Sequence, residues 1–315
     1  MTKKNIFIRL KWLWIACGAA VLAVLCFFAG KMIYIKSADT SWQDELGYNE
    51  NEIYHLKQDR VGCPQIPVQL GGDTYYFDFD TGCNSEIVLT NALEGKFNYT
   101  VTDQVEQLNR DGSHRGWSYG INIGELEFFG GIYKNIDCVM IDWKMSSSDE
   151  FNGLIGTEMF KNRVVTLDYR AQIMGVGEKA PDYSELPKEK YAVVPILRTG
   201  TEGQENLVFF ECELNGEKAV VYIDTGKNVS YIHSLNSTYI IGSGTDKRPD
   251  TTKRDAKVKI GELSFEIKGA YEAGIAQYDD FEGTIAAEFN SDQFVKNDLV
   301  VTFDFIDDLI VFFKR

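Results

Sequence analysis

The chain from about Cys63 to its C-terminus follows a two-residue hydrophobic period. Short apolar runs alternate with polar residues, and Gly, Asn and Asp interrupt these runs. Such alternation is typical of strands that bury one face. Residues 177–190 contain two prolines and several charges, as a linker does. The pattern predicts an all-β body divided into residues 61–176 and residues 191–315.

An uncharged segment precedes this body. The 19 residues between Lys11 and Lys31 include no charged side chain. As a helix they would extend about 28 Å at roughly 1.5 Å per residue, which matches a hydrocarbon core of about 30 Å. Two tryptophans near the start of the segment fit the membrane interface. We predict a transmembrane helix over residues 12–33.

The flanking charges predict the orientation of this helix. Four positive charges precede the uncharged segment, two follow it, and the first acidic residues come later. The positive-inside rule then places residues 1–11 in the cytoplasm and the body outside the cell membrane, in a single-pass arrangement. Residues 34–60 are polar and acidic without a sustained apolar period, so we interpret them as a stalk.

Two other fates of the N-terminus compete with an anchor. A cleaved signal peptide needs small residues at its cleavage site, and Phe28-Ala29-Gly30 fits that requirement poorly. Lipid attachment at Cys17 or Cys26 needs a preceding lipobox, and neither cysteine has a convincing one. We therefore favour an uncleaved anchor.

The charge of the body argues against nucleic-acid binding. The net charge is −15, but residues 1–36 carry +6, so the remainder carries −21. An acidic body of this size repels phosphate backbones. Simple solubility explains the acidity equally well, so the charge predicts no particular partner.

The cysteines and histidines give little material for a metal or nucleophilic site. Outside the anchor the cysteines are Cys63, Cys83, Cys138 and Cys212, which allow three disulfide pairings. The sequence has no C-x-x-C motif, and its three histidines are scattered. We expect neither a metal site nor a Ser-His-Asp triad.

The strongest signal in the body is an internal repeat. A strand-like aromatic run ends on Asp80-Thr81-Gly82, and 144 residues later a second apolar run ends on Asp224-Thr225-Gly226. Four blocks recur in the same order in the two halves. They pair residues 68–70 with 212–214, 123–128 with 260–265, 151–160 with 281–289, and 164–169 with 300–305. The body is therefore predicted to consist of two copies of one β unit.

On these motifs, residues 61–315 resemble the two lobes of a pepsin-like aspartic peptidase, and individual motifs are similar to bacterial retropepsin-like sequences. The resemblance implies a bilobal acid-protease fold of two related β-barrel-like lobes. It also implies a catalytic dyad of Asp80 and Asp224. Thr81 and Thr225 would then hydrogen-bond across the lobe interface and brace the two loops.

The chemistry of such a dyad explains why the motif occurs twice. Two carboxylates about 3 Å apart cannot both ionise easily, so they share a proton, as in pepsin, the standard case of this effect. One carboxylate activates water and the other supplies a proton. Gly82 and Gly226 allow the tight turn and the close approach of the two loops. The resemblance implies no metal or organic cofactor, and both lobes lie in one chain, so the site does not require oligomerisation.

A flap from the first half is also expected from the resemblance. In the family, a hairpin of the first lobe closes over the substrate and usually presents a tyrosine. Residues 109–114 are the predicted hairpin tip, and Trp117 or Tyr119 would be the covering aromatic residue. The alternative is that each aromatic side chain is an ordinary packed strand residue.

Three positions depart from the family pattern. Cys83 and Lys227 stand where a Ser, Thr or Ala is usual, and Ala286 stands where the repeat places a counterpart of Gly156. Cys83 is not expected to be a nucleophile, because no histidine is placed beside it. A lysine near the dyad would favour its doubly ionised state, unless the side chain turns outward to solvent, as lysines commonly do.

Lys227 therefore leaves two functions open. The first is a membrane-anchored extracytoplasmic aspartic endopeptidase that acts on peptide or protein substrates. The second is a catalytically silent pseudoprotease that binds extended peptides or an envelope protein in the same cleft.

Overall fold

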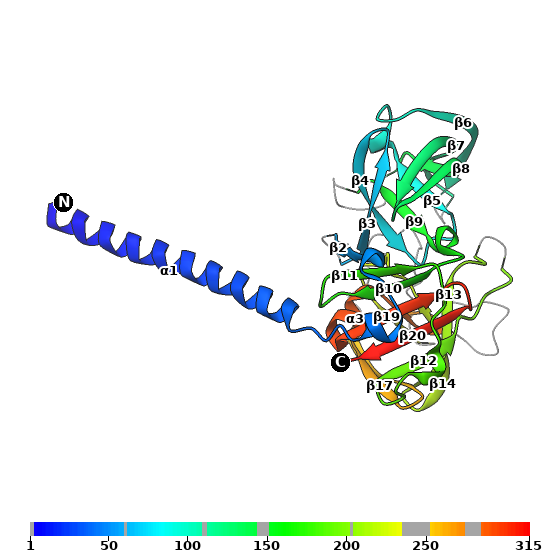
Figure 1. Cartoon of the computed structure of the whole chain (residues 1–315). Coiled ribbons are helices and arrows are strands. Elements are labelled where there is room, and N and C mark those ends of the chain that lie inside the picture. Colours follow the sequence, from blue (N-terminus) through cyan, green and yellow to red (C-terminus); the bar gives the residue numbers. More distant parts are fainter. Residues whose placement is uncertain are drawn as a thin grey trace.

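A computed structural model describes residues 3–59, 62–108, 112–143, 151–201, 204–234, 253–274 and 285–315, with side chains from residue 17 onward. The described chain is mostly β-strand, as the alternating pattern predicts. Its strands form an eight-stranded sheet, a closed six-stranded barrel and a separate six-stranded sheet. One long apolar helix lies at the N-terminus (Figure 1).

The eight-stranded sheet belongs to the first half of the body. Its strands are β2 (Lys57–Gln58), β3 (Pro64–Leu70), β4 (Asp73–Asp80), β5 (Ile87–Thr90), β6 (Tyr99–Leu108), β7 (His114–Phe128), β8 (Gly131–Ile141) and β9 (Gly153–Gly156). They run in the order β2-β3-β4-β9-β5-β8-β7-β6, and β3 also pairs with β7. Short 3-10 helices lie at Asn91–Leu93 and Thr157–Phe160. The strand that carries the first Asp-Thr-Gly motif is thus paired on both sides.

The closed barrel belongs to the second half. Its strands are β13 (Val208–Leu214), β14 (Glu217–Ile223), β15 (Tyr231–His233), β16 (Lys253–Ile260), β17 (Leu263–Ala273) and β18 (Ile285–Phe289), in the order β13-β14-β18-β15-β17-β16. Helix α3 (Ser291–Asn297) follows β18. In each half the motif strand pairs in parallel with a late strand, β4 with β9 and β14 with β18.

The third sheet is built from both halves. It contains β1 (Ile53–His55), β11 (Ile173–Gly177), β10 (Val164–Asp168), β19 (Leu299–Asp304), β20 (Leu309–Lys314) and β12 (Tyr191–Pro195), in that order. The halves join where β10 pairs antiparallel with β19. At this seam the buried hydroxyl groups of Thr166 and Thr302 lie 2.7 Å apart. We call this sheet the shared sheet.

The apolar core continues from one half into the other. Phe79 of β4 packs edge-on against Phe160, with ring centroids 4.9 Å apart, and against Phe303 of β19, at 6.2 Å. All three rings are fully buried. Burying each aromatic side chain contributes about 1.5–3 kcal/mol. The core therefore holds the first motif strand against the shared sheet.

The N-terminal helix α1 (Lys3–Lys36) is long and apolar enough to cross a membrane. The part from Cys17 to Lys36 has a mean hydropathy of 2.0, and none of it is buried against the body. Figure 1 shows α1 projecting away from the body, with the C-terminus near the point where α1 joins it. The helix begins nine residues before the predicted segment of 12–33 and ends three residues after it.

The interpretation of residues 34–60 as a stalk is wrong for most of their length. Helix α2 (Trp42–Glu45), a 3-10 helix (Glu50–Glu52) and β1 pack against the body. Trp42 is completely buried, and its indole N–H donates a hydrogen bond to Asp168 at 2.9 Å. The segment is polar on average, but its few apolar residues pack against the shared sheet.

The linker is likewise attached to the body. A 3-10 helix (Tyr183–Glu185) lies within residues 177–190, and the Tyr183 hydroxyl donates to Asp304 of β19 at 2.8 Å. This connection therefore runs along the shared sheet rather than away from it.

Candidate active site

The two Asp-Thr-Gly loops meet at the centre of the molecule. Each follows a strand whose last residues are buried, as are Phe79 before the first loop and Ile223 before the second. A Cβ atom built on Gly82 would lie 2.5 Å from Cγ of Asp224, and one on Gly226 would overlap Cγ of Asp80. Only glycine leaves this space free at both positions. Each glycine therefore allows the carboxyl group of the opposite loop to approach.

Four hydrogen bonds interlock the loops. The Thr225 backbone N–H donates to Oγ1 of Thr81 at 3.1 Å, and the Thr81 backbone N–H donates to Oγ1 of Thr225 at 3.0 Å. Each hydroxyl in turn donates across the interface, Thr81 to the carbonyl of Ile223 at 2.8 Å and Thr225 to that of Phe79 at 2.7 Å. Both threonines are completely buried. This reciprocal arrangement holds the two carboxyl groups at a fixed separation.

The two carboxyl groups form a coupled pair. Asp80 and Asp224 are 9% and 8% exposed, and their side chains are hydrogen-bonded to each other. Burial, followed by the negative charge of Asp224, raises the pKa of Asp80 well above its usual value. Backbone N–H groups of Gly82 and Gly226 act in the opposite direction but do not outweigh these effects. Burial and the neighbouring carboxyl group therefore both favour the protonated form of Asp80.

Lys227 turns inward, so the alternative of a solvent-facing side chain is wrong. Its ammonium lies 3.4 Å from Oδ2 of Asp224 and forms an ion pair with Glu288. Burial lowers the pKa of Lys227, but the two carboxylates outweigh burial and raise that pKa above its usual value. Lys227 therefore places a permanent positive charge beside the dyad.

Glu288 and His233 are site residues that the sequence did not single out. Glu288 lies on β18 and His233 on β15, and His233 Nε2 is 3.0 Å from Oε1 of Glu288. Burial raises the pKa of Glu288, but hydrogen bonding from His233 and the charge of Lys227 outweigh burial and lower it. One signal was present in the sequence, because Glu288 is the acidic residue of the otherwise apolar run 285–289.

The match between Gly156 and Ala286 is wrong in register. In the first half Asp80 pairs with Gly156 across β4 and β9. In the second half Ile223 pairs with Phe289, so the position opposite Asp224 is Asn290. The pairing in the structure is therefore displaced by four residues, from Ala286 to Asn290, relative to the alignment of the repeat. Residues 281–284 lie outside the described residues.

Asn290 braces the second loop in place of a glycine. It is 1% exposed, and its side-chain amide donates to the carbonyl of Lys227 at 3.2 Å. Its amide oxygen accepts from the Ser230 hydroxyl at 2.7 Å. The neighbouring Ser291 hydroxyl donates to the carbonyl of Thr225 at 3.2 Å. These three polar side chains support the loop that carries Asp224 and Lys227.

The flap candidates lie on β7. Trp117 and Tyr119 pair with Glu106 and Gln104 of β6 in an antiparallel hairpin. Tyr119 packs against the main apolar core, and the Trp117 backbone N–H donates to Asp142 at 2.6 Å. Residues 109–111 of the predicted hairpin tip lie outside the described residues. A covering role for either aromatic ring stays a prediction.

The body cysteines are free, so none of the three disulfide pairings is formed. Burial, followed by the charge of Asp80, raises the pKa of Cys83 to about 12, so its thiol stays protonated. Burial also raises the pKa of Cys63, whose thiol donates to the carbonyl of Gly226 at 3.2 Å. Both cysteines therefore act as hydrogen-bonded thiols beside the loops and not as nucleophiles.

One group near the dyad has metal-ligand composition. Ligand atoms of Asp59, Cys63 and Asp78 lie within 4.8 Å of one another. Asp59 already accepts the backbone N–H of Cys63 at 2.8 Å, and Asp78 accepts the side-chain amide of Gln65 at 3.0 Å. The Cys63 thiol is protonated as well. The polar groups of these three residues therefore already take part in hydrogen bonds within the protein.

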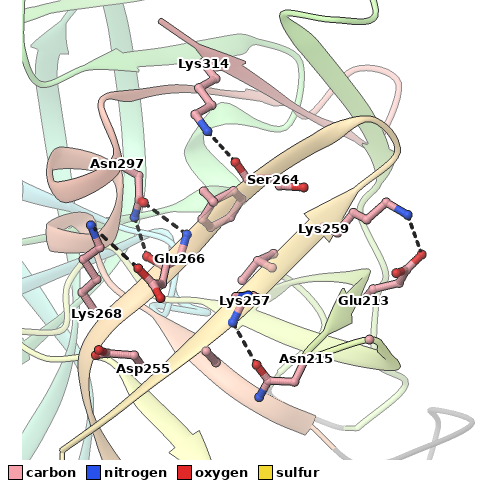
Figure 2. Close-up of a pocket in the computed structure, with 14 residues that line it drawn as sticks. Glu213, Asn215, Asp255, Lys257, Lys259, Ser264, Glu266, Lys268, Asn297 and Lys314 are labelled. Atoms are coloured by element: carbon pink, nitrogen blue, oxygen red, sulfur yellow. Dashed lines mark hydrogen bonds and ion pairs between the residues drawn. The ribbon is translucent and has the colours of Figure 1, made fainter.

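A large hollow lies on the barrel, away from the dyad. Its volume is about 950 Å³, and strands β13, β16 and β17 contribute most of its lining. Figure 2 shows lysines and carboxylates intermixed around it, including Lys259 paired with Glu213 at 3.4 Å and Lys314 bound to the Ser264 carbonyl. Four lysines and three carboxylates line the hollow, so it carries an excess of only one positive charge.

Comparisons with known proteins do not identify the chain. No family model matches it, and no curated protein matches it.

Proposed function

We propose that this chain is a membrane-anchored aspartic endopeptidase of the pepsin-like type. The observation that carries the proposal is the pair of interlocked Asp-Thr-Gly loops, with two buried and mutually hydrogen-bonded carboxyl groups. Buried carboxyl groups that share a proton can supply a base and an acid at one place. A merely structural role would not require two reciprocal copies of the motif.

The proposed architecture is a bilobal acid-protease fold. The eight-stranded sheet would form most of an N-terminal lobe over residues 61–176, and the closed barrel most of a C-terminal lobe over residues 191–315. The parallel pairings of β4 with β9 and of β14 with β18 support this view, because each half supports its Asp-Thr-Gly loop in the same way.

The proposed reaction is hydrolysis of a peptide bond by water. The ionised carboxylate of the dyad takes a proton from water as the water oxygen attacks the carbonyl carbon. The protonated carboxyl group gives its proton to the carbonyl oxygen, which produces a neutral tetrahedral diol. The carboxyl group that received the water proton then protonates the amide nitrogen, while the other aspartate, now ionised, takes a proton from a diol hydroxyl. The C–N bond breaks, a carboxylic acid and an amine leave, and the dyad again holds one proton.

The proposed location of the reaction is outside the cytoplasm. Helix α1 would cross the cell membrane with residues 1–11 on the cytoplasmic side, since the positive charges concentrate there. Peptide or protein substrates would then be met on the extracytoplasmic side.

The inward orientation of Lys227 favours a second candidate, a silent pseudoprotease that binds extended peptides. A full positive charge 3.4 Å from Asp224 favours complete ionisation of the dyad, which would remove the shared proton. Under this alternative the wild-type chain binds peptides without cleaving them from acid to neutral pH. Lys227→Ala would then restore hydrolysis.

The deciding experiment compares Asp80→Asn and Asp224→Asn with the wild-type full chain on a peptide library. We expect each variant to abolish cleavage, because one carboxyl group cannot serve as both base and acid. Asp73→Asn, at the exposed start of β4, is the matched control and should cleave normally. Cleavage that survives in both dyad variants would refute the proposal, and mass spectrometry of the products would reveal it.

A further inference from the structure

A row of polar and charged side chains, buried except for the 24% exposed Lys227, extends from the dyad into the barrel. From Asp224 Oδ2 it passes to the Lys227 ammonium at 3.4 Å, then through the Lys227–Glu288 ion pair to His233, and ends on the carbonyl of Gly274. The side chains of Glu288 and His233 are 6% and 1% exposed. Such a row is costly to bury unless each member is paired.

The hydrogen bonds determine where the protons of this row lie. The Gly274 carbonyl can only accept, so His233 Nδ1, at 2.5 Å, carries a proton. Glu288 pairs with the Lys227 ammonium as a carboxylate, and His233 Nε2 lies 3.0 Å from the other oxygen of that carboxylate. The charges alternate from Asp224 through Lys227 to Glu288 as negative, positive and negative, and His233 supports the far side of Glu288.

This row contacts only one member of the dyad. Asp224 receives the ammonium, whereas Asp80 receives backbone N–H groups of Gly82 and Gly226. A full positive charge stabilises a carboxylate more strongly than neutral N–H donors do. A neutral Asp80 can still accept both N–H groups on its carbonyl oxygen while its hydroxyl donates to Asp224.

We propose that Lys227, held by Glu288 and His233, is a positioning residue that keeps the negative charge on Asp224 and the shared proton on Asp80. This inference rests on the proposed function. In that reaction Asp224 would be the base that activates water, and Asp80 would be the acid that protonates the carbonyl oxygen.

Glu288 has a balancing part in this arrangement. The groups around the Lys227 ammonium are Asp224 from its own loop, Glu288 from β18, and the rings of Tyr222 and Tyr231 at 5.2 and 5.8 Å. Glu288 thus offsets much of the positive charge that would otherwise drive the dyad to complete ionisation. The Lys227–Glu288 ion pair thus leaves enough positive potential at Asp224 to favour ionisation of Asp224 over Asp80. It does not leave enough to remove the shared proton.

Melting temperatures test the proton assignment without any need for turnover. Asp80→Asn replaces a neutral acid with a neutral amide of the same shape, so the full chain should melt at pH 7 no lower than the wild type. Asp224→Asn removes one of the two carboxylates that pair with the partly buried Lys227 ammonium and should lower the melting temperature by roughly 5 °C. Equal melting temperatures, or the reverse order, would overturn the assignment.

The pH profile of kcat/KM tests the positioning role. In Lys227→Met, removal of the positive charge disfavours each ionisation of the dyad, so both limbs should move to higher pH by about one unit. In Glu288→Gln the uncompensated ammonium favours ionisation, so both limbs should move to lower pH. Lys259→Met and Glu213→Gln alter a half-exposed ion pair on the barrel surface and should leave the profile unchanged.

The outcomes separate the two proposals. If the pH profiles of Lys227→Met and Glu288→Gln shift in the same direction, or if neither profile shifts, the positioning role is overturned. Absence of cleavage in every chain, wild type included, would refute the proposed function, and the melting comparison would still decide the proton assignment.

Discussion

At the scale of single residues, the candidate site depends on the absence of two Cβ atoms. Gly226 lies against the carboxyl group of Asp80, and Gly82 lies against that of Asp224. Neither glycine has a positive φ, so backbone strain does not explain them. The requirement comes from space, because the loops could not otherwise bring the carboxyl groups together. The threonines between aspartate and glycine then fix the approach by hydrogen bonds.

Gly226→Ala should therefore impair activity far more than folding. The added methyl group pushes the Asp80 carboxyl group out of place, and a displacement of about 1 Å can lower kcat/KM by roughly 100-fold. Overpacking at the loop should cost about 1–3 kcal/mol of unfolding free energy. Peptide cleavage kinetics and chemical denaturation measure the two effects separately.

Gly124→Ala is the matched control for that substitution. Gly124 is an exposed residue of β7 whose added Cβ would meet no atom within 4 Å. We expect unchanged cleavage and a change in unfolding free energy below about 1 kcal/mol. A Gly226→Ala chain that cleaves as fast as the Gly124→Ala chain would show that the loops do not need this close approach.

At the scale of elements, the segment between α1 and the body is part of the fold. Trp42 is buried beside Leu46 in a small cluster with Tyr191 and Phe313 of the shared sheet. The C-terminal residue Arg315 reinforces the contact, since its guanidinium pairs with Asp168 and donates to the carbonyl of Asp39 at 2.8 Å. The docking of α2 and β1 therefore ties the end of α1 closely to the body.

Trp42→Ala should destabilise the protein strongly. Loss of a fully buried tryptophan typically costs about 3–5 kcal/mol. Trp42→Phe retains most of the apolar contact and loses the hydrogen bond to Asp168, so it should cost about 1–2 kcal/mol. Chemical denaturation of the full chain measures both values. Equal and small losses in the two variants would mean that residues 37–59 behave as the stalk that their composition suggested.

At the scale of the whole molecule, the two halves cannot be separated without breaking a sheet. Strand β10 of the first half pairs with β19 of the second, so strands of both halves form one continuous sheet. The core continues across this seam through Phe79 and Phe303. Each half alone would expose an unpaired strand edge and a cut apolar core.

We therefore expect the body to unfold in a single cooperative transition. Calorimetry, far-ultraviolet circular dichroism and tryptophan fluorescence should report coincident midpoints. Chains that end at residue 190 or begin at residue 191 should fail to fold when they are produced alone. Two separated transitions would show instead that the halves are independent domains joined only by a linker.

Much of this description follows from the sequence because its causes are local or repeated. Alternation of apolar and polar residues determines strands, an uncharged run of membrane length determines an apolar helix, and a duplicated motif indicates two related units. The sequence alone also placed Asp80 and Asp224 at the ends of buried strands. None of these inferences requires knowledge of which residues meet in space.

The tertiary structure decided the features that depend on long-range contacts. The pairing of β14 with β18 placed Asn290, and not Ala286, opposite Asp224. Lys227 points inward because it forms an ion pair with Glu288, although a lysine in a loop usually faces solvent. Residues 37–59 docked on a sheet whose other strands lie more than 100 residues further along the chain. Pairing energies between distant segments exceed local preferences at these positions, and no local pattern records them.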